Sequence, residues 1–164
     1  MRALAAVFAC SFIIGIASVP ALAGPKQKHR PVAVSDIYQP SSTLFGSSLV
    51  AEARKYIGTN PTGRRSLWCG AFMDLVLRRT GHKGGGNLAK GYLRYGKRVH
   101  GPVVGAIAVM GRKGGGHVGI VTGVDPNGNP IVISGNTWNR QSGGKRAVLE
   151  HVYQKGRIYA YVMP

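Results

Sequence analysis

A cysteine, a histidine and an asparagine stand where they could act together as a nucleophile, a base and an orienting group. Cys69 lies in the block S-L-W-C-G-A-F of residues 66–72, at the start of a stretch with helical apolar spacing. A thiol in the first turn of a helix faces unpaired N–H groups and the positive end of the helix dipole. Both favour the thiolate, which is the nucleophilic form. Cys69 is therefore a candidate nucleophile, and the alternative is a buried, inert cysteine.

Two residues in the second half of the chain could serve this thiol. His117 follows the glycine run 114–116 and opens a predicted strand. Gly119 lies on the same face of that strand and leaves room for another backbone, such as a helix N-terminus. The imidazole could then take the thiol proton and later protonate the leaving amine. The alternative is a surface histidine beside a flexible glycine loop.

Asn136 is the third candidate, at the end of the next predicted strand. If the two strands are neighbours, its amide oxygen could accept the second ring N–H of His117 and hold the useful tautomer. Considered alone, an asparagine at this point is a turn residue.

Three helical segments are predicted before the strands. The first covers residues 47–58, from a serine cap to a glycine stop. The second begins near Cys69, with Ser66 as a possible N-cap and Gly81 as its stop. A weaker third segment covers residues 87–95. We expect the Cys69 helix to present a face made of Phe72, Leu75, Val76 and Arg79.

After residue 102 the pattern changes to short β-rich runs separated by Gly and Asn/Pro turns. The predicted strands are residues 106–110, 118–124, 130–134, 147–153 and 158–163. Helices followed by meandering antiparallel strands are typical of an α+β domain. We therefore expect one domain over residues 47–164, with N-terminal helices packed on an antiparallel sheet or small open barrel of about five strands.

The first 46 residues are expected to form a leader and a linker. Residues 1–23 have a positive Arg2, an apolar run and a small-x-small cleavage site at 21–23, which is typical of a signal peptide. The apolar run is too short for a convincing membrane span, so we expect no stable membrane insertion. Residues 24–46 form a basic, Pro- and Ser-containing linker. These features predict an exported protein, periplasmic or secreted, in which Cys69 is the sole remaining thiol.

The charge balance indicates an anionic partner, because the chain has 22 Lys and Arg against 5 Asp and Glu. Nucleic acid, membrane headgroups and an acidic cell-wall polymer are the alternatives, together with plain solubility. Export, and the lack of zinc-finger or RNA-binding patterns, argue against nucleic acid. Five acidic residues argue against a two-carboxylate glycosidase. The histidines lack ligand spacing, so no metal site is expected.

The ordered motifs resemble the CHAP/NlpC-like superfamily of papain-like cysteine amidohydrolases and peptidases. The similarity covers roughly residues 48–164 and is carried by S-L-W-C-G-A-F at 66–72, V-G-A-I-A-V-M at 104–110, G-G-H-V-G-I-V-T-G-V at 115–124 and S-G-N at 134–136. The resemblance implies a papain-like α+β fold. It also implies Cys69 as nucleophile, His117 as base, Asn136 as third polar residue, and action on amide bonds of bacterial peptidoglycan without a cofactor.

Two features depart from the family pattern. Many relatives have an Asp-Cys-Ser-Gly block, whereas this chain has W-C-G-A at residues 68–71. Many also place a tyrosine shortly after the first helix, where this chain has T-N-P at residues 59–61. The backbone N–H of Cys69 can still donate to an oxyanion, and its partner in that role is left open.

The resulting functional hypothesis is an exported cysteine hydrolase that cleaves peptidoglycan as an endopeptidase or amidase. It would form an acyl-enzyme on Cys69 and act as a monomer on the wall or its stem peptides. One alternative is a non-catalytic envelope protein that binds anionic wall polymer. Another is an acyltransferase that uses the same three residues.

Overall fold

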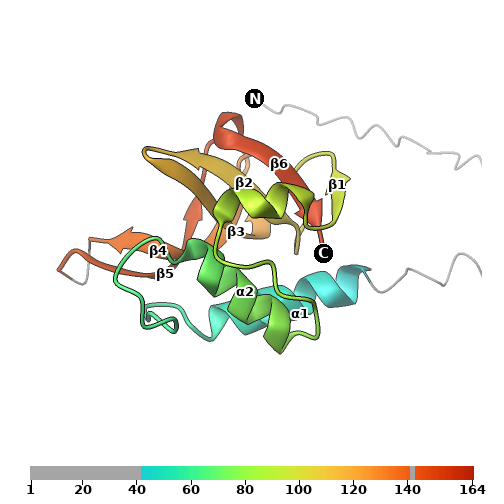
Figure 1. The fold of residues 1–164 in the computed structure, drawn as a ribbon. Helices are drawn as coiled ribbons and strands as arrows, with labels where there is room; N and C mark the ends of the chain where they lie inside the picture. Colours follow the sequence, from blue (N-terminus) through green and yellow to red (C-terminus); the bar gives the residue numbers. More distant parts are fainter. Residues whose placement is uncertain (1–41, 141–142) are drawn as a thin grey trace, which may run out of the picture.

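A computed structural model of the protein describes residues 42–140 and 143–164. Two α-helices lie on the same side of an antiparallel sheet in this part of the chain (Figure 1). The predicted signal peptide, residues 1–23, and residues 24–41 of the predicted linker lie outside the described residues. Over the described ranges, no helix is long and apolar enough to cross a membrane.

The sheet has six strands in the order β1-β6-β2-β3-β4-β5 and is open, with β1 and β5 at its edges. The strands are β1 (Lys97–Val99), β2 (Ile107–Arg112), β3 (Gly115–Val124), β4 (Pro130–Asn139), β5 (Lys145–Val152) and β6 (Ile158–Met163). The helical elements are α1 (Ser42–Arg54), α2 (Cys69–Arg79) and the 3-10 turns η2 (Ala89–Arg94) and η3 (Lys155–Arg157). The predicted α+β architecture is therefore confirmed.

One strand of this sheet was not predicted. β1 has only three residues, of which Lys97 and Arg98 are exposed, so it has no apolar alternation that would reveal a strand. It forms because Lys97–Val99 pairs with the end of β6. Tertiary pairing, rather than local sequence, makes this segment a strand.

The first helix differs from its prediction at both ends. α1 begins at Ser42 rather than at residue 47, and it ends at Arg54 rather than near Gly58. Leu49, Val50 and Ala53 are buried, as a helix over this region requires. Ile57 is outside the helix and 45% exposed, and it forms an isolated bridge with Val148 of β5.

The second helix begins at Cys69, as predicted, but without the predicted cap. Trp68 is the N-cap residue and makes no side-chain capping hydrogen bond, so the assignment of Ser66 was wrong. The predicted apolar face was wrong in part, because Met73 and Leu77 are buried while Leu75 is only partly buried. The helix ends at Arg79 with Thr80 as its C-cap, and Gly81 follows with a φ of 82°, which confirms the predicted glycine stop.

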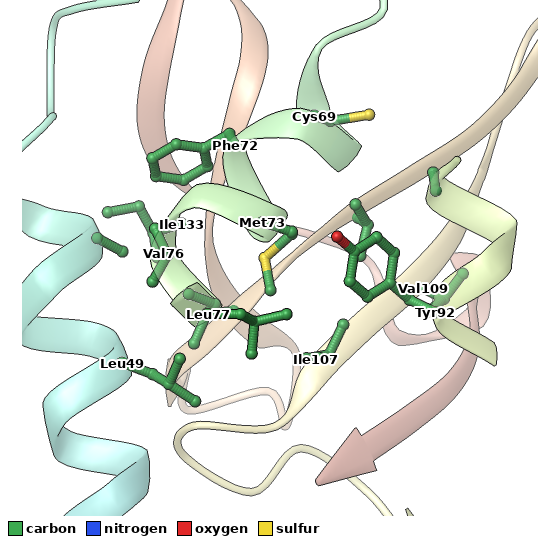
Figure 2. Close-up of a cluster of buried hydrophobic side chains, with 14 of the residues drawn as sticks. Leu49, Cys69, Phe72, Met73, Val76, Leu77, Tyr92, Ile107, Val109 and Ile133 are labelled. Carbon is green, nitrogen blue, oxygen red and sulfur yellow. The ribbon is translucent and has the colours of Figure 1, made fainter. Parts of the chain in front are cut away.

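Two apolar clusters lie on opposite faces of the sheet. The larger one joins α1, α2 and η2 to the sheet, and Figure 2 shows Leu49, Phe72 and Ile133 among its members. The smaller one, Ala106, Ala108, Met110, Val121 and Val132, covers the other face. Because side chains alternate along a strand, His117 shares the second face with Val121, and Met110 is its register partner on β2.

Candidate active site

A cleft of about 530 Å³ opens at the N-terminal end of α2. It is lined by Cys69, the segment before α2, the start of η2, the β2–β3 turn, and residues of β4 and β5. Leu67 and Leu88 on this lining are 72% and 78% exposed. Leu67 also has a φ of 56°, an uncommon conformation for a large side chain. The cleft therefore combines a buried thiol with exposed apolar side chains.

Cys69 lies on the wall of this cleft at the first position of α2. Its sulfur points away from the apolar side chains packed under the helix, as Figure 2 shows. Only 4% of the residue is exposed, and the cleft that Cys69 lines is the route by which a substrate would reach its thiol. Because Trp68 supplies no side-chain cap, the N–H groups of the first turn remain available to a bound anion.

The loop before η2 is held tightly against the start of α2. A Cβ on Gly70 would lie 2.1 Å from the carbonyl oxygen of Asn87, so only glycine fits there without movement of the backbone. The buried Tyr92 hydroxyl donates to the carbonyls of Gly70 and Gly86, at 3.0 and 2.8 Å. Burial raises the pKa of this hydroxyl, which stays a donor. These contacts fix the part of the cleft wall that is formed by η2 and the loop before it.

His117 lies beside the cleft and is 4% exposed. Its Nε2 is 3.0 Å from the hydroxyl of Ser134 and 3.4 Å from the hydroxyl of Tyr153. Burial, together with the nearby cations Arg112, Arg157 and Arg146, lowers the pKa of His117 to about 3. The imidazole is therefore neutral at pH 7, as a general base must be.

The prediction that Asn136 is the hydrogen-bond partner of His117 was wrong. Asn136 Oδ1 is buried and has no hydrogen-bond partner, whereas the Ser134 hydroxyl meets the His117 ring. The register of β4 with β5 shifts between Ser134 and Thr137, and Asn136 has a φ of 59° at this bulge. The bulge directs Asn136 to the cleft that Cys69 also lines.

Gly119 leaves room for another backbone, as predicted, but this backbone is not a helix N-terminus. A Cβ on Gly119 would lie 2.5 Å from the carbonyl oxygen of Ile133 on β4, so this glycine admits the neighbouring strand. The glycine that admits α2 is Gly135, whose Cβ would lie 2.6 Å from the ring of Trp68. The close approach of helix and sheet was therefore assigned to the wrong strand.

Two arginines converge on Asn136 from different strands. Arg112 Nη2 and Arg146 Nη1 both donate to the backbone carbonyl oxygen of Asn136, at 3.3 and 3.2 Å. Arg112 Nη1 also lies 3.5 Å from Nδ1 of His117. Cys69 and Asn136 thus share the cleft, while His117 adjoins it through Arg112 and is not hydrogen-bonded to the thiol in the described structure.

Sequence reasoning missed Ser134, Arg112 and Arg146 as site residues. Ser134 belongs to the S-G-N motif and lies next to Ile133, so strand alternation could have placed it on the face of His117. The two arginines contributed only to net charge, because nothing local distinguishes them from the other basic residues. In the part of the chain that is described, no cluster of three His, Cys, Asp or Glu side chains suits a metal ion.

Comparisons with known proteins give a family match and a fold match. Residues 60–136 match the family described as the CHAP domain. The fold is similar to the crystal structure of a wild type endolysin, LysIME-EF1, with a TM-score of 0.54 and 14% sequence identity. That match covers 73% of this chain and 63% of the endolysin chain. A search of curated protein sequences found no match.

Proposed function

We propose that this chain, whose residues 60–136 match the CHAP domain family and whose fold is similar to that of an endolysin, is a cysteine hydrolase of peptidoglycan. The observation that carries the proposal is the position of Cys69. Its thiol lies at the uncapped start of α2, on the wall of a cleft that a buried neutral histidine adjoins through Arg112. A nucleophile at a helix start with a base nearby is the arrangement that covalent acyl transfer requires.

The proposed reaction has two steps. His117 takes the thiol proton while Cys69 Sγ attacks the amide carbonyl, and the imidazolium then gives that proton to the leaving amine as the C–N bond breaks. Water, activated by His117, attacks the thioester, and the S–C bond breaks to release the acid and restore the thiol. The backbone N–H of Cys69 would donate to the oxyanion in both steps.

The residues around His117 have distinct roles in this proposal. Ser134 and Tyr153 hold the ring through Nε2, at 3.0 and 3.4 Å. That leaves Nδ1, which faces Arg112, as the ring nitrogen that would accept the thiol proton. Asn136 remains a member of the site, as a cleft residue beside Cys69 rather than as the partner of the histidine.

The substrate and location complete the proposal. Export to the periplasm or the medium is supported by the leader-like residues 1–23, and a wall substrate by the net charge of +17. The printed name of the similar structure, an endolysin, points to the same class of substrate. Cleavage in the stem peptide, or between peptide and glycan, would yield peptide fragments.

A second function deserves a test because of one observation. Arg112 lies against His117 Nδ1, and no hydrogen bond joins that ring to Cys69 in the described residues. A protein that binds anionic wall polymer through its basic surface without turnover would also tolerate this arrangement. Binding and cleavage must therefore be measured separately.

The test uses purified peptidoglycan and the variant Cys69→Ser, which replaces the thiol by a hydroxyl that ionises poorly. Wild type should release fragments, whose masses identify the bond. The variant should release none but should still co-sediment with the wall, and added salt should weaken this binding. Release of fragments by the variant at the wild-type rate would place the chemistry elsewhere. No release by wild type, over several wall types and pH values, would favour the binding protein.

A histidine series tests the second residue of the site. His117→Ala should abolish release and slow the alkylation of Cys69 by iodoacetamide near neutral pH. His82→Ala and His100→Ala should do neither. Equal losses in all three variants would indicate general destabilisation instead of a base.

A further inference from the structure

Four cations line the cleft beside Cys69, namely Lys90, Arg112, Lys113 and Arg146, and none of them forms an ion pair with a described carboxylate. Arg112 and Arg146 are the two guanidinium groups among them, and both contact Asn136. The four described carboxylates are already used: Glu52 pairs with Lys55, Asp74 with Arg78, Glu150 with Arg54, and Asp125 accepts from Asn127 and Asn129.

The two guanidinium groups are held in fixed positions. Both donate to the backbone carbonyl oxygen of Asn136, so one neutral acceptor serves two cations. Arg146 also lies over the ring of Trp138, with Cζ 5.6 Å from the ring centroid, and Arg112 lies against His117. A guanidinium carries five N–H donors in a planar fork that matches a carboxylate. Most of those donors are therefore free to meet an anion that enters the cleft.

A polar acceptor accompanies the two cations. Asn136 Oδ1 is buried and has no hydrogen-bond partner among the described residues. It belongs to a residue that is 1% exposed and lines the same cleft. A buried acceptor without a partner is costly unless a ligand supplies a donor. Two carboxylate-binding forks next to an amide acceptor match a peptide that has a carboxylate close to a backbone N–H.

We propose that Arg112 and Arg146 bind a free carboxylate of the substrate peptide beside the bond that Cys69 attacks, while Asn136 Oδ1 accepts a peptide N–H. This inference rests on the proposed hydrolase function and narrows its substrate class. The enzyme should prefer stem peptides in which the carboxylate next to the scissile bond is free over those in which it is amidated.

Substrate binding at this subsite would also prepare His117 for catalysis. Arg112 Nη1 lies 3.5 Å from Nδ1, where its charge opposes the imidazolium that forms when the thiol loses its proton. A carboxylate that pairs with Arg112 would offset this charge and draw the guanidinium from the ring. The preference for the free acid should therefore appear in kcat as well as in KM.

The experiment compares two substrates that differ in one group. Disaccharide-tetrapeptides containing either D-isoglutamate or D-isoglutamine are purified, and kcat/KM is measured for each. Wild type should favour the free acid by at least about tenfold, since a charge-assisted bidentate pair contributes 1.5 kcal/mol or more. Arg112→Gln and Arg146→Gln should each lower this ratio toward one.

Matched variants exclude a simple effect of charge. Arg98→Gln removes the same charge from the exposed edge strand β1 and should keep both the ratio and the rates. Arg157→Gln removes a cation that lowers the pKa of His117 but does not line the Cys69 cleft, and it should keep the ratio. A fall of the ratio in either variant as large as in Arg112→Gln would overturn the subsite.

The outcomes separate this inference from the function on which it rests. Equal hydrolysis of both substrates by wild type would overturn the subsite and leave the hydrolase intact. If wild type hydrolyses neither substrate nor whole peptidoglycan, the hydrolase fails, and calorimetric binding of both peptides to Cys69→Ser decides the subsite. Tighter binding of the free acid, lost with Arg112→Gln, would support it, and equal binding would overturn it.

Should Arg112→Gln fail to fold, Arg112→Lys, which lacks the fork, should give an intermediate ratio.

Discussion

The hydroxyl oxygen of Ser134 lies 3.0 Å from Nε2 of His117. The same hydroxyl is 3.0 Å from Thr137 Oγ1 and 3.3 Å from the hydroxyl of Tyr153. The ring of the proposed base is thus fixed at one nitrogen by a buried hydroxyl network, while its other nitrogen faces Arg112. The contact with His117 that the sequence predicted for Asn136 is made instead by Ser134, which lies just before the bulge in β4.

Ser134→Ala should therefore lower turnover without weakening substrate binding. Loss of the hydroxyl releases the ring, so we expect kcat to fall by at least about tenfold with KM nearly unchanged. Ser134→Thr keeps the hydroxyl and should recover part of the rate. Steady-state release of muropeptides measures both constants. Wild-type kcat in Ser134→Ala, together with an inactive Asn136→Ala, would return the orienting role to Asn136.

The buried imidazole should make the fold sensitive to mild acid. The pKa of His117 is lowered from 6.5 to about 3, so between these values the unfolded chain binds a proton that the folded chain does not. The stabilising contribution is complete above pH 6.5 and is lost as pH falls toward 3, at about 1.4 kcal/mol per pH unit. Urea unfolding at pH 7 to 5 measures this slope above the range where carboxylates titrate.

The control for that slope is a second histidine. His117→Gln should reduce the pH dependence of the free energy of unfolding between pH 6.5 and 5. His151→Gln, at an exposed position on β5, should leave it unchanged. Identical slopes in wild type and His117→Gln would show that His117 titrates normally in the folded protein.

Gly70→Ala should damage the cleft wall. The new Cβ would lie 2.1 Å from the Asn87 carbonyl oxygen. Because the Cβ is fixed rigidly to the backbone of α2 and the oxygen belongs to the backbone of the loop, one of these two segments must move. We expect a loss of about 1–3 kcal/mol in the free energy of unfolding, typical of overpacking, and lower activity. Gly91→Ala is the matched control, since its Cβ would meet nothing nearer than 3.8 Å. Equal stability of the two variants would contradict this account.

Two substitutions at Asn136 should separate its backbone role from its side-chain role. With a φ of 59°, the position suits glycine, whereas alanine is strained there by about 1–2 kcal/mol. Asn136→Gly should therefore unfold at a higher urea concentration than Asn136→Ala. Both variants lose the amide and should lose activity to a similar extent. Full activity in Asn136→Gly would mean that only the backbone of this residue matters.

The sequence by itself determined the features that depend on local pattern. Cys69 begins a helix because an apolar period of 3.6 starts there, and Gly81 follows its end because a glycine adopts a positive φ at no steric cost. β3 and β4 formed where β-branched runs lie between turn residues. Propensity, periodicity and turn chemistry act over a few residues, and the sequence contains all of them.

Only the tertiary structure decided which side chains meet in the site. Arg112 and Asn136 are 24 positions apart, and Ser134 and His117 are 17 apart. Their contacts depend on the register of three strands and on the bulge after Ser134. A shift of one residue in a strand moves a side chain to the other face, so the same amino acids in another register would form no site. Register is fixed by packing of the whole sheet against its helices, which no local pattern contains.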